Sequence, residues 1–233
     1  MLKKADVGII GALSDEVAHI IELLEERECA LISGIEFNYG KIGTRNVVVA
    51  KCGVGKVFAA LCAEAMILNY SPSLIINSGV GGALEGSLVP TDIVFAKNLV
   101  QHDMDTSPLG DPKGLISGIN RIYFECDPRA VQILEEIAKE RGQRYLVGTV
   151  ATGDRFIAEG PDKERIVENF GAVACEMEGG AIAHVAFVTA TPCVVIRAIS
   201  DSADGVASMD YPAFLPIAAA TSTALTLGLV ERY

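Results

Sequence analysis

Short apolar runs alternate along this chain with segments whose apolar residues recur at helical spacing. The runs Val7–Ala12, Leu74–Asn77 and Cys193–Ile199 are almost entirely apolar, which is typical of strands buried on both faces of a sheet. The segment Val17–Leu24, after the first run, repeats apolar residues at intervals of three and four, as one face of a helix does. This alternation predicts an α/β fold with a largely parallel sheet covered by helices on both faces.

One part of the chain indicates antiparallel pairing. The stretch 28–52 contains three short strand-like runs separated by glycine turns, which predicts a meander and therefore a mixed sheet. Further strands are expected at 92–99, 145–151 and 173–177, and helices at 56–70, 128–141, 162–169, 178–189 and 212–231. Residues 1–233 contain no repeat or linker, so they are expected to form a single domain.

Three local features carry more specific expectations. Ser14 has the residue type that caps a helix, and we expect it to cap the first one. The segment Gly79–Gly82 is expected to form a loop at the end of a strand. The stretch 104–120 is rich in Gly, Pro, Asp and Ser and predicts a long loop, a kind of segment that is often functional.

Charge and cysteine content restrict the function classes. The net charge of −11 repels a phosphate backbone, so nucleic acid is not an expected partner. No pair of the six cysteines has CxxC spacing, and we expect buried free thiols in a reducing compartment. The N-terminus lacks the signal-peptide pattern, and the apolar stretches are too short for a membrane span. A cytoplasmic protein without a membrane partner is therefore expected.

Two glycine motifs resemble nucleotide-binding sequences without completing either pattern. Gly53-Val54-Gly55-Lys56-Val57 lacks the hydroxyl residue and the earlier glycine of a phosphate-binding P-loop. Gly79–Gly82 lacks the glycine spacing of a dinucleotide site. Both are interpreted as tight strand-to-helix turns, and the second also as a place where a ligand can approach the backbone closely.

Metal chemistry and serine-hydrolase chemistry lack their usual motifs. The three histidines form no HxH or HExxH pattern and no Cys/His cluster. No nucleophile elbow supports a Ser-His-Asp triad. Neither a metal nor a cofactor is therefore expected.

Acidic residues are concentrated where predicted strands end. Glu16 lies in the first turn of a helix, where the helix dipole stabilises its anion. Glu176 and Glu178 lie at the end of one strand, and Asp201 ends another. Because ligands bind at the carboxyl ends of strands in open α/β sheets, we expect these residues and Gly79–Gly82 to face one site. The alternative is that these acids serve only helix starts and ion pairs.

Several segments taken together resemble the nucleoside phosphorylase/hydrolase superfamily and, within it, the 5′-methylthioadenosine/S-adenosylhomocysteine nucleosidases. They occur in the family's order over nearly the whole chain. The segments are Gly8–Val17, Gly53–Val57, Ile75–Gly82, His102-Asp103, Thr152–Ile157, Glu176–Glu178 and Arg197–Asp201. The resemblance implies a three-layer α/β/α sandwich around a mixed sheet, a homodimer, and a metal-free reaction. That reaction cleaves the N-glycosidic bond of 5′-thio-adenosines with water.

The resemblance also implies roles for residues. Glu16 matches the base that orients water, and Asp201 matches the acid at adenine N7. Met177 and Glu178 match the ribose contacts. Two contacts to adenine and two further positions in the site complete the set: Phe156 for stacking, Ile157 for its backbone, Gly82 in the glycine-rich segment, and Arg197 near the water and the carboxylates.

Two positions depart from the family pattern. Val80 stands where relatives often carry serine near the sugar. Leu109 replaces an aromatic residue that, in the family, a partner subunit places beside the 5′-thio group.

Three other functions remain to be weighed. One is a related purine-nucleoside hydrolase acting on futalosine or a 5′-deoxyadenosine derivative. Another is a purine nucleoside phosphorylase, which must bind a phosphate dianion. The segment Gly11–Val17 offers it Asp15 and Glu16 and no cation, which favours hydrolysis. The third is a non-catalytic nucleoside-binding protein, which would have no need of Glu16.

Overall fold

The computed structural model describes residues 3–157, 160–201 and 207–233, and its side chains up to 200 and from 215 within those ranges. The strands are β1 (Val7–Gly11), β2 (Glu25–Ile32), β3 (Ile35–Ile42), β4 (Arg45–Lys51), β5 (Leu74–Ala83), β6 (Ile93–Gln101), β7 (Tyr123–Glu125), β8 (Tyr145–Thr152), β9 (Ala172–Glu176) and β10 (Cys193–Asp201). The helices are α1 (Ser14–Glu22), α2 (Lys56–Tyr70), α3 (Pro128–Glu140), α4 (Pro161–Phe170), α5 (Gly179–Val188) and α6 (Ala207–Arg232), with a 3₁₀ turn at Ser107–Leu109.

The strands form one mixed sheet, as the alternation and the meander predicted. Its order is β10-β6-β8-β9-β5-β1-β4-β3-β2, and β7 pairs with β6. β10 also pairs with β5, so the sheet closes on itself through β10, β6, β8, β9 and β5. The meander is β2, β3 and β4, which pair antiparallel and extend the sheet beyond β1. The closure through the pairing of β10 with β5 was not predicted, because pairing between strands that are distant in the sequence leaves no local signal.

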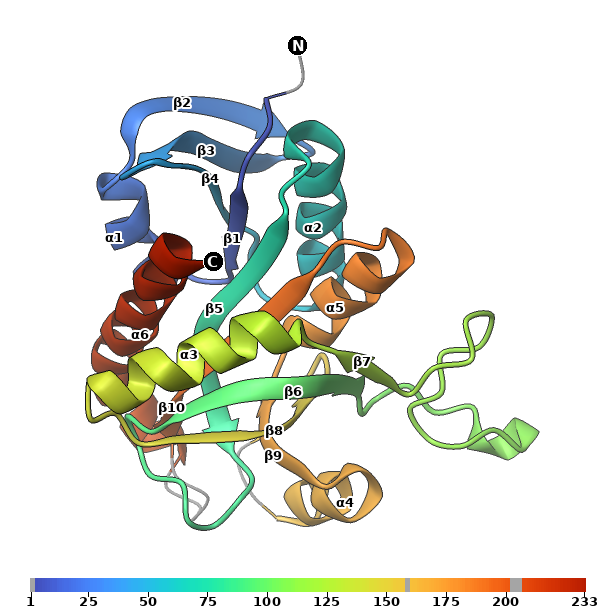
Figure 1. Cartoon of the computed structure of the whole chain (residues 1–233). Helices are drawn as coiled ribbons and strands as arrows, with labels where there is room; N and C mark the ends of the chain where they lie inside the picture. Colours follow the sequence, from blue (N-terminus) through green and yellow to red (C-terminus); the bar gives the residue numbers. More distant parts are fainter. Residues whose placement is uncertain (1–2, 158–159, 202–206) are drawn as a thin grey trace.

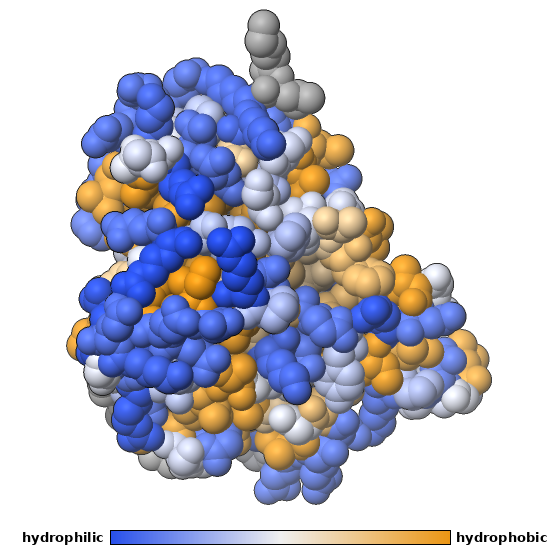
Figure 2. Space-filling model, viewed as in Figure 1, coloured by the Kyte–Doolittle hydropathy of each residue, from blue (hydrophilic) through white to orange (hydrophobic). Residues whose placement is uncertain are grey.

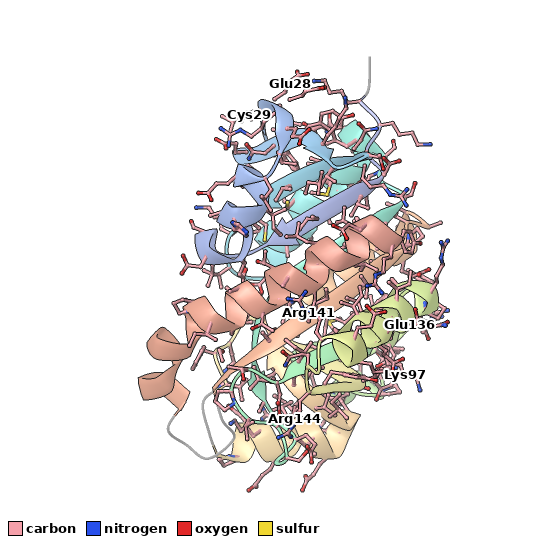
Figure 3. All side chains as sticks on the ribbon, turned by 60° about the vertical axis from the view of Figure 1, so that its left-hand side comes forward. Glu28, Cys29, Lys97, Glu136, Arg141 and Arg144 are labelled. Carbon is pink, nitrogen blue, oxygen red and sulfur yellow. The ribbon has the colours of Figure 1, made fainter. Side chains whose placement is uncertain are left out.

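Helices cover both faces of the sheet and complete the α/β/α arrangement. In Figure 1, α1, α3 and α6 lie on one side, and α2 and α5 lie together on the other. Figure 3 shows from a second direction that α6 and α3 cross in front of the strands. The core between these layers is built from fully buried aliphatic side chains such as Ile9, Ile76 and Val195. No helix among the described residues is long and apolar enough to cross a membrane.

The glycine-rich segment is strand rather than loop, so that prediction was wrong. β5 continues through Gly79 and Gly81 to Ala83. It pairs parallel with β10, with Gly79 opposite Arg197, and antiparallel with β9, with Gly82 opposite Cys175. Pairing on both edges overrides the tendency of glycine to form turns. The missing side chains make room for other groups above the strand.

The prediction that Ser14 caps α1 was also wrong. Ser14 is the first helical residue, and Leu13 occupies the cap position. The Leu13 backbone N–H donates to Oε2 of Glu16 at 2.9 Å, which satisfies a group that the helix itself cannot. The Ser14 hydroxyl instead accepts from Nζ of Lys51 at 3.3 Å. The carboxylate of Glu16 thus stabilises the start of its own helix.

Two further expectations can be compared with the structure. Five cysteines are buried free thiols as expected, but Cys29 is exposed on β2, where the strand forms an outer edge of the sheet.

The stretch 104–120 is a long connection, and Figure 1 shows it projecting from the body beside β7. Figure 2 shows that the viewed face is largely hydrophilic, with hydrophobic areas between the hydrophilic ones.

Candidate active site

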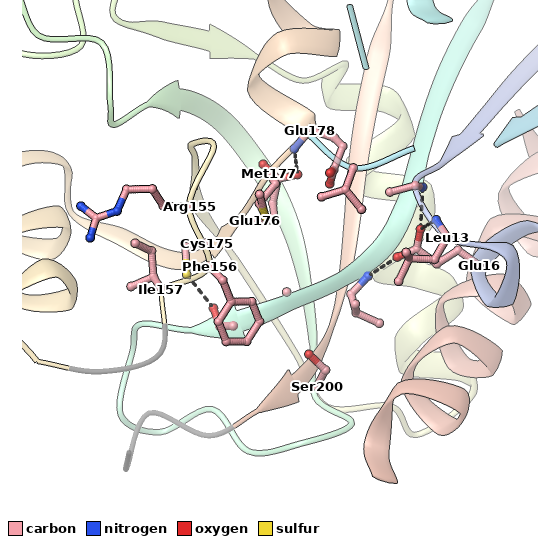
Figure 4. Close-up of a pocket in the computed structure, with 15 residues that line it drawn as sticks. Leu13, Glu16, Arg155, Phe156, Ile157, Cys175, Glu176, Met177, Glu178 and Ser200 are labelled. Atoms are coloured by element: carbon pink, nitrogen blue, oxygen red, sulfur yellow. Dashed lines mark hydrogen bonds between the residues drawn. The ribbon is translucent and has the colours of Figure 1, made fainter. Parts of the chain in front are cut away.

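A cavity of about 200 Å³ lies where the carboxyl ends of several strands meet. Figure 4 shows side chains from the segments after β1, β8 and β9 turned toward it. Its lining consists of Ala12, Leu13, Glu16, Val54, Val80, Gly81, Gly82, Arg155, Phe156, Ile157, Cys175, Glu176, Met177, Glu178 and Ser200. Segments that are far apart in the sequence therefore meet at one site, at the place where α/β sheets bind ligands.

Glu16 is held in a single orientation on the cavity wall. Its Oε2 atom accepts from the backbone N–H of Ala12 at 2.6 Å and of Leu13 at 2.9 Å, and Oε1 accepts from Val80 N–H at 3.1 Å. The residue is 4% exposed. Burial raises the pKa of Glu16. The Leu13 N–H and the Arg197 charge lower it by less, so the net shift is upward. These donors stabilise the carboxylate where burial alone would disfavour it.

Glu176, which lines the cavity, forms a buried ion pair with Arg197, which does not. Nη2 of Arg197 contacts Oε2 of Glu176 and the side-chain oxygen of Asn77, and Nη1 donates to the backbone oxygen of Ile196 at 2.9 Å. Arg197 is 1% exposed and is not among the lining residues. Burial raises the pKa of Glu176. Arg197, the hydrogen bond from Thr152 and the backbone donors together lower it by more, so the net shift is downward.

Backbone N–H groups complete the environment of Glu176. Its Oε2 atom accepts from Gly179 N–H at 2.6 Å and from Glu178 N–H at 2.9 Å, at the start of α5. The helix dipole favours an anion at this end. The ionised Glu176 therefore fixes the turn that presents Met177 and Glu178 to the cavity.

Glu178 is the third carboxyl residue that lines the cavity. It occupies the cap position of α5, is 7% exposed, and its Oε1 atom accepts from Gly55 N–H at 2.8 Å. Burial, followed by the nearby charge of Glu176, raises its pKa to about 7, while Arg197 and the Gly55 N–H act in the opposite direction. This carboxyl group can therefore exist in both protonation states near neutral pH.

The other residues singled out from the sequence lie at or beside the cavity. Phe156, Ile157, Met177 and Gly82 line it, and Phe156 is 55% exposed. The backbone of Asp201 ends β10 opposite Gly82, but its side chain lies outside the described part of the structure. Two positions noted as departures differ in place, because Val80 lines the cavity whereas Leu109 is 84% exposed on the projecting loop.

The match to a family model covers nearly the whole chain. Residues 6–231 match the model of the phosphorylase superfamily. The chain belongs to the phosphorylase superfamily. The resemblance to its methylthioadenosine/S-adenosylhomocysteine nucleosidases is confirmed by curated relatives. One from Actinobacillus succinogenes, named 5′-methylthioadenosine/S-adenosylhomocysteine nucleosidase, is 36% identical over 97% of this chain and 98% of its own length.

Solved structures of other superfamily members have the same fold. A Helicobacter pylori nucleosidase variant with 5′-methylthioadenosine in its active site has a TM-score of 0.94 and 33% identity, covering 98% of this chain and 99% of its own. A futalosine hydrolase from Helicobacter pylori has a TM-score of 0.94 and 35% identity, covering 100% of this chain and 99% of its own. The predicted fold class is thereby confirmed.

Several residues at this superfamily site were not assigned roles from the sequence. The hydroxyl of Thr152 contacts Glu176 and accepts from Gly180 N–H at 2.7 Å. Asn77 joins Arg197 to the backbone oxygen of Ile10, which accepts from its amide at 2.9 Å. Gly55 donates to Glu178 from a motif that had been interpreted only as a turn. Thr152 and Gly55 lie in the segments Thr152–Ile157 and Gly53–Val57. The residues around them in the sequence do not indicate that their partners are Glu176 and Glu178.

The described residues of this superfamily member offer no metal site. No group of three or more His, Cys, Asp or Glu side chains among them is arranged to hold a metal ion. The carboxylates at the cavity are instead occupied by backbone N–H groups and by Arg197. The described lining presents carboxyl groups, oriented backbone N–H groups, the Ser200 hydroxyl, the Cys175 thiol and apolar side chains.

Proposed function

We propose that this chain hydrolyses the N-glycosidic bond of 5′-methylthioadenosine and S-adenosylhomocysteine, releasing adenine and the 5′-thio-ribose. The observation that carries the proposal is the placement of Glu16 and Glu178 on one cavity, each fixed by backbone donors. The full-length similarity to nucleosidases with these substrates in their names supports it. A place for this reaction in methionine salvage is part of the same proposal.

In this proposal Glu16 aligns water and Glu178 holds the sugar. Water is a weak nucleophile, and a rigidly held carboxylate can accept its proton as the bond to C1′ forms. Glu178 accepts hydrogen bonds from ribose hydroxyls. The sugar becomes oxocarbenium-like in the transition state, so an anion there stabilises the transition state more than the substrate. Met177 supports the sugar from the same turn.

The adenine is proposed to lie against Phe156, with the backbone of Ile157 at its edge. Adenine leaves poorly as an anion, and protonation at N7 lets it leave neutral. We assign that acid role to Asp201, with Ser200 beside it on the cavity wall. Such general-acid assistance contributes on the order of 10²–10⁴ in rate. We assign Gly82 to a backbone contact with substrate, and Arg197 to holding Glu176 rather than to a substrate contact.

Water is favoured over phosphate as the nucleophile. A phosphorylase needs cationic groups for the phosphate dianion. Arg197 is buried and paired with Glu176. Arg155 pairs with Asp162 at 2.6 Å, and Figure 4 shows its guanidinium directed away from the cavity. Within the described lining, the neighbourhood of Glu16 therefore holds anionic charge and backbone donors.

A futalosine-type nucleoside is the second candidate substrate. The observation that favours it is the equal structural likeness to a futalosine hydrolase. Cleavage of the bond between the purine and C1′ would proceed in the same way in a futalosine-type nucleoside. The two substrates would differ in the group attached at the 5′ carbon. A 5′-deoxyadenosine derivative belongs to the same class.

A second copy of the chain is the proposed partner. α2 and α5 expose Val57 (78%), Val188 (62%) and Leu68 (61%). A groove of about 570 Å³ lies between these helices. Apolar faces of this kind are typical of interfaces, and the resemblance implies a homodimer. Sedimentation at micromolar concentration should give twice the mass of the chain, whereas a monomer would contradict this partner.

We further propose a cytoplasmic location and a single domain over residues 1–233. Five cysteines are buried as free thiols, which suits a reducing compartment. The family model spans the chain as one unit.

The test is a nucleoside panel assayed with purified protein. Methylthioadenosine, S-adenosylhomocysteine, a 6-amino-futalosine, 5′-deoxyadenosine and inosine are each incubated with and without phosphate, and base release is followed. We expect phosphate-independent release of adenine from the two thio-nucleosides. Faster cleavage of the futalosine-type nucleoside would select the second candidate, and a phosphate-dependent rate would overturn hydrolysis.

A further inference from the structure

The glycine motif before α2 touches a residue of the proposed reaction. The N–H of Gly55 donates to Oε1 of Glu178 at 2.8 Å. Gly55 has φ of 101° and ψ of 162°, a conformation that residues with a side chain rarely adopt. A Cβ at this position would lie 3.0 Å from Oδ1 of Asp154. The donor to Glu178 therefore depends on the backbone just before α2 and on what packs against it.

Asp154 secures that backbone. Its Oδ1 atom accepts from Lys56 N–H at 2.8 Å, directly after Gly55 in the chain. The first N–H groups of a helix have no partner within the helix, so a carboxylate there fixes the start of α2 and suits its dipole. The carboxylate of Asp154 thus acts on the peptide next to the one that serves Glu178.

A closed ring of polar contacts holds Asp154 in turn. Its own N–H donates to Oδ2 of Asp103 at 3.0 Å, and Oδ1 of Asp103 pairs with Nζ of Lys56 at 2.6 Å. The side chains of Lys56 and Asp103 are 20% and 25% exposed, so solvent screens this ion pair only in part. Burial raises the pKa of Asp103, but Lys56 and the Asp154 N–H lower it by more, which keeps the carboxylate ionised.

The ring joins three segments beside the cavity, where Lys56 and Asp154 line the groove between α2 and α5. Lys56 begins α2, Asp103 follows β6, and Asp154 follows β8 just before Phe156 and Ile157. The same contacts thus relate the proposed adenine segment to the donor that holds Glu178. A loss at Asp154 would release both the start of α2 and the loop after β8.

We propose that Asp154, supported by Asp103 and Lys56, is a positioning residue that keeps the Gly55 N–H on Glu178 during the reaction. This inference rests on the proposed function, because Glu178 is there assigned to the ribose hydroxyls. Asp154 itself is not among the cavity-lining residues. It lines the groove between α2 and α5, and the route to the sugar that we infer for it runs through Gly55 and Glu178.

Three variants test the inference. Asp154→Ala removes the acceptor, and Asp154→Asn keeps a side-chain oxygen for the Lys56 N–H. Asp127→Ala is the matched control, because Asp127 accepts from Ala130 N–H at 2.7 Å at the start of α3, a helix that lines no part of the described cavity. It removes the same kind of cap without touching the ring.

We expect Asp154→Ala to lower kcat roughly tenfold to a hundredfold with a smaller change in KM, because the hydrogen bond from Gly55 N–H to the charged Glu178 is weakened or lost. The acid limb of kcat/KM should move up by as much as about one pH unit, because the Gly55 N–H that favours ionised Glu178 is no longer held against it. The other groups that act on Glu178, namely Glu176, Arg197, Glu16 and the Cys52 thiol, stay in place. Asp154→Asn should restore most of kcat, and Asp127→Ala should leave kcat and the acid limb unchanged.

An Asp154→Ala enzyme with the wild-type kcat and acid limb would overturn the inference, as would the same losses in Asp127→Ala. The carboxyl ¹³C shift of Glu178, followed against pH in wild type and Asp154→Ala, separates this failure from that of the proposed function. If wild type cleaves none of the nucleosides, the function fails, but a raised Glu178 pKa in Asp154→Ala still supports the positioning role. An unchanged Glu178 titration overturns it.

Discussion

Oε1 of Glu16 lies 2.6 Å from the point that a Cβ on Gly79 would occupy. The carboxyl carbon of Glu16 lies 3.0 Å from the same point. Real Cβ atoms essentially never come closer than 3.0 Å to another atom, so the Glu16 oxygen at 2.6 Å would have to move. The absence of a side chain at Gly79 thus makes room for the carboxylate that Ala12, Leu13 and Val80 hold. A glycine inside a paired strand is costly to stability, and here it has a positional reason.

Gly79→Ala should displace Glu16 without preventing folding. β5 has an extended conformation at this position that alanine adopts, so the added methyl group acts on the carboxylate above it. We expect kcat/KM to fall roughly a hundredfold or more, and the free energy of unfolding to fall by about 1–3 kcal/mol from overpacking. Steady-state kinetics and denaturant unfolding measure the two effects.

Gly86→Ala is the control for this substitution. A Cβ on Gly86 would meet no atom within 4 Å, so activity and stability should stay near wild type. A Gly79→Ala enzyme with near-normal kcat/KM would show that Glu16 need not lie where the structure places it.

Glu16→Gln and Asp201→Asn should each reduce kcat at least about a hundredfold, in line with the loss of a general base or acid. Both substitutions keep the shape of the side chain, so the circular dichroism spectrum and melting temperature should change little. In Glu16→Gln the new amide oxygen can still accept one N–H, but the amide cannot take a proton from water. A rate within a few fold of wild type in either variant contradicts the role assigned to that residue.

The protonation of Glu178 should govern the acid side of the pH profile. Its pKa is raised to about 7, and the proposed role needs the ionised form to accept from hydroxyl groups. We expect kcat/KM to fall as pH decreases below about 7, because the free enzyme then carries a neutral carboxyl group. The limb should be absent from the weak residual activity of Glu178→Gln, and a limb that persists there belongs to another group.

The same shift has a consequence for stability with a defined sign. A carboxyl group with a raised pKa in the folded state binds more protons than it does when unfolded. Its contribution is present below about 4.5, the usual value, and is lost as pH rises through about 7. Wild type should therefore lose stability relative to Glu178→Gln over this window in urea unfolding. An unchanged difference between the two would contradict the shifted pKa.

Breaking the buried ion pair should destabilise the protein more than removing it whole. Arg197→Met leaves the carboxylate of Glu176 buried without its cation, which typically costs about 3–5 kcal/mol. Adding Glu176→Gln removes the uncompensated charge and should recover part of that loss. Guanidinium unfolding of the two single variants and the double variant measures the coupling. A single-variant loss below about 1 kcal/mol would mean that the pair does not hold this wall of the cavity.

The sequence predicted those elements whose conformation depends on their own residues. The Ala-rich segment predicted at 56–70 is α2, Lys56–Tyr70, and the meander 28–52 is β2 to β4. The segment Gly79–Gly82 was misassigned because its strand form is imposed by β10 and β9, which come from distant parts of the sequence. The exposure of Cys29 likewise depends on β2 lying at an edge.

The candidate site was predictable to the level of which strand ends meet. Glu16 and Glu178 could be brought together from their positions after predicted strands, and the structure places both on one cavity. Their partners could not, because the donors are backbone groups such as Gly55 N–H and Val80 N–H, which every sequence contains. Ser14 was chosen as a helix cap by residue type, whereas Glu16 satisfies that helix start through tertiary geometry.

The most direct test of hydrolysis at this cavity is single-turnover cleavage of 5′-methylthioadenosine in H₂¹⁸O, with phosphate absent and then present. The proposal predicts adenine release at the same rate in both cases, with one ¹⁸O atom at C1 of the methylthioribose, and loss of that signal in Glu16→Gln. A sugar 1-phosphate as product, or intact nucleoside after prolonged incubation with folded protein, would contradict it.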